Sequence, residues 1–134
     1  MKEPKILITG ACGFIGTNLI NDLITKGIIK NPKENIIGID NMSHGTFLNG
    51  VHDKINLVYG DIRNMVISSY FKDIDFVFHF AGLVSIYDCD ANPTEAFDNN
   101  IMGSINVFDA CIKNNVKKII FSETSAMYED STVL

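Results

Sequence analysis

The sequence predicts an α/β protein in which a doubly wound parallel sheet carries helices on both faces. Short apolar runs alternate along the chain with segments of helical period, a pattern typical of parallel strands joined by crossovers. We expect these crossovers to be right-handed, as in nearly all parallel sheets. The chain has 134 residues, 46% of them apolar, which suffices for one sizeable core. No linker, repeat or change of composition divides it, so residues 1–134 are interpreted as one domain.

Five apolar runs are expected to form the strands. They occupy residues 5–9, 35–40, 55–59, 76–80 and 117–122. Apolar residues at three- and four-residue spacing predict a helix after the first run. Its buried face is expected to consist of Phe14, Ile15, Leu19, Ile20, Leu23 and Ile24. Gly27 suits the left-handed residue that closes such a helix.

The last helix has recognisable signals at its beginning. Asn92 can cap it, Pro93 stands at the first helical position, and Glu95 falls where a capping-box acid belongs. The apolar stripe of this helix is expected to consist of Phe97, Ile101, Ile105, Phe108 and Ile112.

Composition and charge exclude several classes of protein. The net charge is -5 and Arg63 is the only arginine among scattered lysines, so the basic stripe of a nucleic-acid-binding protein is missing. The longest apolar clusters are strand-sized and no apolar signal segment follows the N-terminus, so no membrane association is expected. We therefore expect a cytoplasmic protein.

The three cysteines, Cys12, Cys89 and Cys111, are odd in number and widely spaced. Without a C-x-x-C pair or a suitably spaced histidine, they predict reduced thiols and no metal site. Cys12 has two interpretations. It is either a thiol whose pKa is lowered near the start of the first helix, or a small side chain that fits between two glycines.

The strongest chemical signal is the segment TGACGFIG, between the first strand and the first helix. Gly10 suits the tight turn out of the strand, Gly13 leaves the backbone open to a pyrophosphate, and Gly16 lets the helix pack closely on the sheet. A purely structural role is the alternative, because glycines are common in all turns. Asp40, at the end of the second strand, favours dinucleotide binding, since a carboxylate there can bind the ribose hydroxyls of an adenosine.

Asp40 also discriminates between two dinucleotides. Its charge would repel the 2'-phosphate of NADP, and no lysine or arginine between Glu34 and Asp53 offsets that repulsion. The sequence therefore predicts NAD as the cofactor.

Six segments in a fixed order carry a resemblance to a known family. They are GACGFIG at 10–16, DNMSHG at 40–45, GDIR at 60–63, HFAGLVS at 79–85, NIMGSIN at 100–106 and FSETSAMY at 121–128. Together they resemble the extended short-chain dehydrogenase/reductases, especially the nucleotide-sugar epimerases and dehydratases. The resemblance covers nearly the whole chain and implies a Rossmann-like fold, truncated after about five strands.

The resemblance also implies the residues of a site. Its cofactor-binding positions are Gly10, Gly13, Phe14, Ile15, Gly16, Asp40, Asn41, Asp61, Ile62, Phe80, Ala81, Gly82, Asn100 and Ser122. Ser85 and Tyr128 are implied to contact a nucleotide-sugar substrate, a UDP-sugar in the full-length form. Thr124 holds the position of the catalytic Ser/Thr, whose hydroxyl polarises the sugar oxygen that becomes a carbonyl.

Structural alternatives remain for three of the residues in these segments. Asp61 can serve as a cap of the turn after the third strand, and Thr124 can satisfy a backbone group at a strand end. His79, a single histidine at the end of an apolar strand, is interpreted as a packed and hydrogen-bonded core residue.

The catalytic Tyr-x-x-x-Lys pair of the family is absent. The residues four positions after the tyrosines are Arg63, Ile74, Ala91 and Thr132. The resemblance places this pair and the substrate-binding part further along, so the chain is interpreted as the N-terminal, cofactor-binding part of an epimerase or dehydratase, inactive by itself. It also implies a homodimer through a helix bundle that includes residues 93–113. The alternative is a stand-alone dinucleotide-binding module or regulator.

Overall fold

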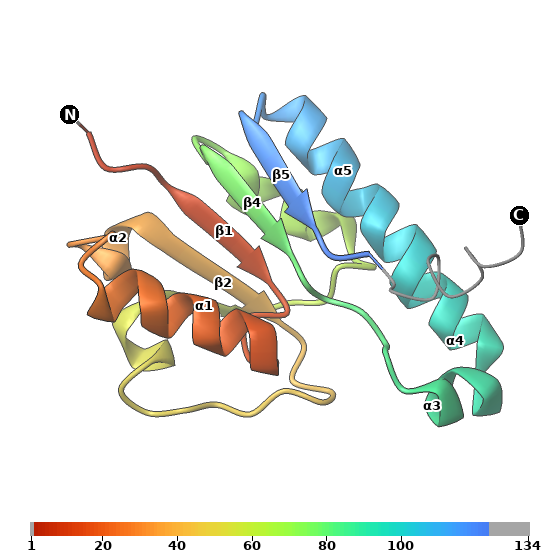
Figure 1. Ribbon diagram of the computed structural model, residues 1–134. Helices are drawn as coiled ribbons and strands as arrows, with labels where there is room; N and C mark the ends of the chain where they lie inside the picture. Colours follow the sequence, from red (N-terminus) through yellow and green to blue (C-terminus); the bar gives the residue numbers. More distant parts are fainter. Residues whose placement is uncertain (1, 124–134) are drawn as a thin grey trace, which may run out of the picture.

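Each of the five apolar runs forms a strand in the computed structural model, which describes residues 2–123. The strands are β1 (Ile6–Thr9), β2 (Ile36–Asp40), β3 (Asn56–Tyr59), β4 (Phe76–His79) and β5 (Lys118–Phe121). Neighbouring strands are parallel and follow the order β3-β2-β1-β4-β5. The predicted five-stranded parallel sheet is therefore confirmed (Figure 1).

The strand β1 lies at the centre of the sheet. The chain first winds to one side through β2 and β3, then returns to the other side through β4 and β5. The register places Thr9, the last residue of β1, between Ile39 and His79. In doubly wound sheets the crevice for a ligand opens where the winding reverses, beyond the carboxyl ends of the strands. The topology thus points to the edge that Thr9 occupies.

One face of the sheet is covered by α1 (Phe14–Thr25), and the short α2 (Pro32–Asn35) leads into β2. Ile20 and Leu23 of α1 are buried against strand residues such as Ile8. Removing these apolar side chains from water stabilises the contact between helix and sheet.

The prediction that Phe14 and Ile15 belong to this buried face is wrong. Their side chains are 86% and 55% exposed. Both stand in the first turn of α1 and line a cavity instead of the core. Helical spacing alone does not distinguish an apolar residue that packs on the sheet from one in a turn beyond its edge.

The opposite face is covered by the 3-10 helix η2 (Met65–Phe71) and by α5 (Ser104–Lys113). Phe71 and Val107 are completely buried there, in a cluster that includes Val77 of β4. Helices on both faces of the sheet, as predicted, are thus present.

Two of the crossovers contain no α-helix between their strands. The chain from β2 to β3 forms, besides a loop, the 3-10 turn η1 (His52–Lys54), and η2 is the helical segment between β3 and β4. The loop at residues 41–51 contains two glycines and two asparagines, which favour turns over a regular helix.

The last helical segment is divided. It consists of α3 (Ile86–Ala91), α4 (Pro93–Phe97), the π-helical turn η3 (Asp98–Gly103) and then α5. The predicted place of Pro93 at the first position of a helix is confirmed.

The predicted capping box does not form at this helix. The Asn92 side chain accepts no capping hydrogen bond. Glu95 instead extends toward Arg63, with Oε1 3.7 Å from Nη1. Since Arg63 follows β3, this ion pair links α4 to the carboxyl edge of the sheet.

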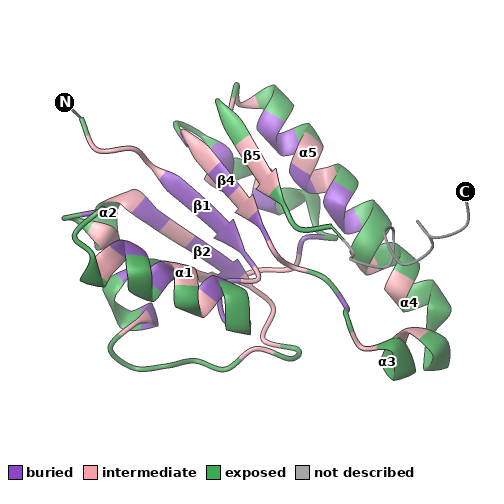
Figure 2. Ribbon diagram, viewed as in Figure 1, coloured by how far each residue is buried: buried purple, intermediate pink, exposed green. Residues whose placement is uncertain are grey.

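The predicted apolar stripe of the last helix is largely exposed. Phe97, Ile101, Ile105 and Ile112 are between 44% and 75% exposed, and Phe108 is half-buried (Figure 2). In the described part of the chain, nothing therefore covers most of this stripe. Within residues 2–123, none of the helices has both the length and the apolar character to cross a bilayer.

Candidate functional site

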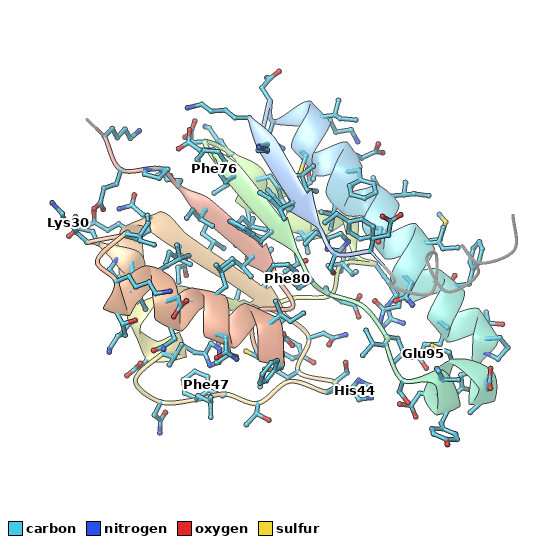
Figure 3. All side chains as sticks on the ribbon, in the orientation of Figure 1. Lys30, His44, Phe47, Phe76, Phe80 and Glu95 are labelled. Atoms are coloured by element: carbon cyan, nitrogen blue, oxygen red, sulfur yellow. The ribbon has the colours of Figure 1, made fainter. Side chains whose placement is uncertain are left out.

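A cavity of about 300 Å³ lies at the carboxyl edge of the sheet, among the loops that follow β1, β2, β3 and β4. The predicted cofactor residues that line it are Gly10, Gly13, Phe14, Ile15, Gly16, Asp40, Asn41, Ile62, Phe80, Ala81 and Gly82. In Figure 3, Phe80 lies at the end of β4 and His44 lies on the loop after β2. Residues from four separate loops thus converge on one cavity.

The glycine loop has the geometry that its sequence predicts for Gly10 and Gly16. Gly10 has a φ of +69°, and a Cβ there would lie 2.7 Å from the backbone N of Ala81. A Cβ on Gly16 would lie 2.3 Å from the carbonyl oxygen of Gly10. Since real Cβ atoms do not approach backbone so closely, only glycine fits the turn and the helix contact at these two positions.

Gly13 differs from the other two glycines, because a Cβ there would meet only the Gly10 carbonyl oxygen, at 3.3 Å. It is the N-cap of α1 and lines the cavity. The first N–H groups of a helix have no intrahelical acceptor, and the helix dipole favours an anion at this end. The bare backbone at Gly13 therefore forms a cradle that fits a pyrophosphate.

Asp40 connects the end of β2 to the glycine loop. Its Oδ2 accepts a hydrogen bond from the Cys12 N–H at 2.8 Å, and its Oδ1 accepts one from the Met42 N–H at 2.7 Å. Each carboxylate oxygen can accept a further bond. The carboxylate is thus held in place beside the cavity and can still receive hydroxyl donors.

Cys12 is not an activated thiol. Burial, together with the neighbouring charge of Asp40, raises the pKa of its thiol to about 11. The interpretation as a thiol of lowered pKa is therefore wrong, and the interpretation as a small, well-fitting side chain holds. A Cβ on Gly45 would lie 2.8 Å from the Cys12 Cβ, which shows how closely the loop after β2 packs on the glycine loop.

Asp61 follows β3 and is paired with Arg63. Its Oδ2 lies 2.6 Å from Nη2 of Arg63, and its Oδ1 accepts the Arg63 backbone N–H at 2.9 Å. The arginine lowers the pKa of this carboxyl to about 2. Asn41, which lines the cavity, donates from Nδ2 to Asp61 at 3.2 Å. The geometry is that of a turn cap, and cofactor binding by Asp61 stays a prediction.

Asn100 lies just outside the cavity and holds the loop after β4. Its Nδ2 donates to the Leu83 carbonyl oxygen at 2.9 Å, and its Oδ1 accepts the Leu83 N–H at 2.7 Å. Its neighbour Asn99 lines the cavity instead. Asn100 thus positions the loop in the structure, while direct contact with a cofactor stays a prediction.

The remaining predicted residues are differently placed. Ser85 is the N-cap of α3, where its Oγ accepts the Asp88 N–H at 3.3 Å. Ser122 is exposed just after β5 and is not among the residues that line the cavity. Thr124 and Tyr128 lie outside the described residues.

The sequence reasoning missed several residues that line the cavity. They are Ile39, Ser43, His44, Gly45, Gly60 and Asn99. Most stand within or beside the segments that carry the family resemblance, so the whole segments are the signal that could have found them.

His52 is a buried residue whose side chain connects the glycine loop to the loop after β2. It is 1% exposed, its Nδ1 accepts the Leu48 N–H at 2.9 Å, and its Nε2 lies 3.0 Å from the Ala11 carbonyl oxygen. Because Nδ1 accepts, Nε2 carries the proton and donates to Ala11.

Among the described residues, no three His, Cys, Asp or Glu side chains gather as ligands of a metal ion.

Comparison with known proteins extends these observations. The NAD dependent epimerase/dehydratase family matches residues 6–133. The UDP-glucose 4-epimerase of Pisum sativum is 33% identical over 134 residues, and that of Yersinia enterocolitica is 35% identical over 135 residues. These matches cover 95% and 92% of this chain, which spans 38% of the length of each relative.

Solved structures show the same similarity. The UDP-N-acetylglucosamine 4-epimerase of Methanobrevibacter ruminantium M1, in complex with UDP-N-acetylmuramic acid, has a TM-score of 0.82 at 33% identity and covers 100% of this chain and 43% of its own. The UDP-glucose 4-epimerase of Bifidobacterium longum, in complex with NAD+ and UDP, has a TM-score of 0.78 at 30% identity. That match covers 93% of this chain and 38% of the other.

Proposed function

Because the chain belongs to the NAD-dependent epimerase/dehydratase family, we propose that it forms the NAD-binding part of a nucleotide-sugar 4-epimerase. The observation that carries the proposal is the cavity where the glycine loop meets the ends of β2, β3 and β4. This cavity lies beyond the carboxyl ends of the strands, where the winding of the sheet reverses and where dinucleotides bind in sheets of this topology. The similarity to UDP-glucose 4-epimerases supports the class of reaction.

Different residues of the cavity would bind successive parts of NAD. Gly13 and the first turn of α1 would hold the pyrophosphate, and Asp40 would accept hydrogen bonds from the adenosine ribose. Asp61 and Ile62 would lie beside the adenine, with Asn41 bonded to Asp61, and the loop at residues 80–82 would pass along the nicotinamide half. NAD, when bound, would supply the acceptor for a hydride from the sugar.

The exposed apolar side chains at the mouth of the cavity favour this assignment. Phe14 and Ile15 stand in the first turn of α1, and Val84, 89% exposed, stands on the loop after β4. Apolar surface beside a few placed polar groups is typical of cofactor sites. A bound dinucleotide would cover these side chains, which explains why α1 does not bury its first two apolar residues.

Substrate binding and catalysis are proposed for three further residues. Ser85 and Tyr128 would contact a UDP-sugar, and the Thr124 hydroxyl would polarise the sugar oxygen during hydride transfer. In a protein that turns over substrate, Thr124→Val should lower kcat far more than it weakens UDP-sugar binding, while Thr124→Ser should retain most activity. A fully active Thr124→Val variant would remove Thr124 from the mechanism.

A homodimer is part of the proposal. It is supported by the exposed stripe of Phe97, Ile101, Ile105 and Ile112, which runs along α4, η3 and α5. Burying such a stripe against another copy would remove apolar surface from water. Sedimentation analysis tests it, since a monomer at all concentrations would contradict the homodimer.

A cytoplasmic location also belongs to the proposal. Cys12, Cys89 and Cys111 are all free thiols, as expected in a reducing compartment. Fractionation of the producing cells tests the location, and recovery of the protein outside the cytoplasm would overturn it.

Calorimetric titration of the purified chain with NAD tests the central proposal. We expect one bound NAD per chain. Absence of binding would overturn the proposal. A second function, that of a stand-alone dinucleotide-binding module, would need the cavity but not the Tyr-x-x-x-Lys pair of the family. Sequencing the reading frame past Leu134 separates the two, because the epimerase requires this pair downstream.

A further inference from the structure

Three buried polar side chains join β1, β4 and α5 beneath the candidate site. Thr9 and His79 are 0% exposed and Ser104 is 6% exposed. His79 lies between the other two, with Nδ1 2.6 Å from the Thr9 Oγ1 and Nε2 3.0 Å from the Ser104 Oγ. Burying polar groups is costly unless they are hydrogen-bonded, and within the described residues no buried side-chain nitrogen or oxygen lacks a partner.

The direction of these hydrogen bonds follows by elimination. The Ser104 hydroxyl donates its one proton to the Asn100 carbonyl oxygen at 2.6 Å. Its oxygen must then accept from His79, so the proton of the neutral ring is on Nε2. The bare Nδ1 accepts the Thr9 hydroxyl proton, and Thr9 Oγ1 accepts the Ala81 N–H at 3.3 Å.

Both ends of this chain of hydrogen bonds reach the loop that follows β4. One end is the Ala81 N–H, held by Thr9. The other end is Asn100, whose side-chain amide binds both backbone groups of Leu83. Residues 80–82 line the cavity, so the segment of the loop that faces a ligand is held from two sides through one imidazole.

The π-helical turn η3 gives Asn100 its place in this network. The Ser104 backbone N–H bonds the Ile101 carbonyl oxygen, while the Ser104 hydroxyl bonds that of Asn100. π-Helices are rare, appear mostly as single turns inside α-helices, and are frequently found at functional sites. Here the turn carries two neighbouring asparagines with different roles. The side chain of Asn100 binds the loop after β4, and Asn99 lines the cavity.

Two aromatic rings hold the imidazole plane. Phe121 is stacked on His79 with ring centroids 5.3 Å apart, and Phe108 meets its edge at 6.0 Å. This apolar packing removes water from the ring, and burial lowers the pKa of His79 to about 4. His79 is therefore neutral at physiological pH, as the direction of its hydrogen bonds requires.

We propose that His79 is a positioning residue which, by joining Thr9 to Ser104, fixes the cofactor-facing loop at residues 80–84. The alternative is that His79 only fills space in the core, in which case an apolar side chain of similar volume would serve equally well. The hydrogen-bond network itself requires no ligand. Only its consequence for affinity rests on the proposed binding of NAD.

The test compares His79→Leu, which removes both hydrogen bonds, with His79→Gln, whose amide can still donate to Ser104. Val77→Ala is the matched control, since Val77 is also completely buried in β4 but lies outside the polar network. NMR of the wild-type imidazole nitrogens should show a neutral ring protonated on Nε2. Hydrogen exchange at the Ala81 and Leu83 amides should accelerate about tenfold in His79→Leu relative to the other core amides, which corresponds to a loss of about 1.4 kcal/mol of hydrogen bonding.

We expect NAD to bind roughly tenfold more weakly to His79→Leu, and His79→Gln to recover most of that loss. Val77→Ala should lower the melting temperature without selective exchange at Ala81 and Leu83. A wild-type ring protonated on Nδ1, or unchanged loop exchange in His79→Leu, would overturn the positioning role. If His79→Leu fails to fold, the positioning role is still tested by the tautomer of the wild-type imidazole and by hydrogen exchange at Ala81 and Leu83 in His79→Gln. If the wild type binds no NAD, the proposed function fails, whereas tautomer and exchange still decide the role of His79.

Discussion

Asp40 accepts a hydrogen bond from the backbone N–H of Cys12 at 2.8 Å, so the carboxylate that ends β2 is tied to the glycine loop. The same side chain accepts from the Met42 N–H at 2.7 Å. Two backbone donors from different loops therefore orient one carboxylate beside the cavity before any ligand arrives. Orientation in advance reduces the entropy that a ligand must remove on binding.

Asp40→Ala should weaken NAD binding by roughly 10- to 100-fold, the effect expected for losing a charged hydrogen-bond acceptor. Wild-type protein should bind NADP far more weakly than NAD, because the carboxylate repels a 2'-phosphate. Calorimetric titration measures both constants. Asp53→Ala, at an exposed position beyond the loop after β2, is the matched control and should leave NAD affinity unchanged. Equal affinity for NAD and NADP would refute the selectivity of Asp40.

Alanine at the loop glycines should have graded effects. Gly16→Ala should destabilise most, since its Cβ would lie 2.3 Å from the Gly10 carbonyl oxygen, and Gly10→Ala adds a positive φ to a contact of 2.7 Å. Gly27→Ala is the matched control, because its φ of +64° is similar but nothing lies within 4 Å. It should cost only about 1–2 kcal/mol. Melting temperatures of the three variants should rank accordingly, and equal losses would contradict the contacts.

Gly13→Ala should separate binding from stability. Its Cβ would meet only the Gly10 carbonyl oxygen at 3.3 Å, so the protein should fold. The methyl group would stand where the pyrophosphate is proposed to approach, so NAD affinity should fall by at least about tenfold. Circular dichroism and calorimetry together check this prediction, which unchanged affinity would contradict.

Much of the fold was predictable from sequence, because the strands are short apolar runs and the sheet is buried on both faces. The glycine loop was predictable as well, since its steric requirements at Gly10 and Gly16 leave one residue type. The exposure of Phe14 and Ile15 was not. Helical periodicity records that a residue is apolar, but whether the core or a ligand covers it depends on where the helix begins relative to the edge of the sheet.

The buried histidines show what the sequence could not predict about the site. Neither His52 nor His79 stands at the spacing of a metal site, and their partners Ala11 and Ser104 are distant in sequence. Such contacts depend on tertiary structure alone. The sequence could indicate only that a histidine at the end of an apolar strand is packed and hydrogen-bonded, and this is confirmed for His79.

Stability should fall as the pH is lowered from about 6.5 to about 4 because of His79. Burial lowers its folded-state pKa from 6.5 to about 4, so in this window the unfolded state binds a proton that the folded state does not. At about 1.4 kcal/mol per pKa unit, the loss amounts to at most about 3 kcal/mol. Urea unfolding across this range should show a shallower dependence in His79→Gln, and an identical slope would contradict the prediction.

Asp61 should contribute to the pH dependence of stability at lower pH than His79. Arg63 lowers the folded-state pKa of its carboxyl to about 2 from the ordinary 3.8, so its stabilisation is present above pH 4 and is lost as the pH falls toward 2. Asp61→Asn should lower the free energy of unfolding above pH 4, where the ion pair with Arg63 is formed, and should remove the decrease of that free energy between pH 4 and pH 2. Asp53→Asn is an exposed control. If wild type and Asp61→Asn show the same pH dependence of unfolding below pH 4, the role of the ion pair is contradicted.

The 134-residue chain should not turn over UDP-glucose or UDP-galactose, even when it binds NAD. Epimerisation at C4 requires a group that takes the hydroxyl proton as the hydride leaves, and such general acid-base catalysis is typically worth about 100- to 10,000-fold. No tyrosine in the chain is followed by lysine four residues later, and the three tyrosines within residues 2–123 do not line the cavity. Thr124 alone could polarise the sugar oxygen but not accept its proton at neutral pH. A coupled assay with purified chain, NAD and either sugar should therefore remain at background, and sustained turnover would show that a different residue serves as the base.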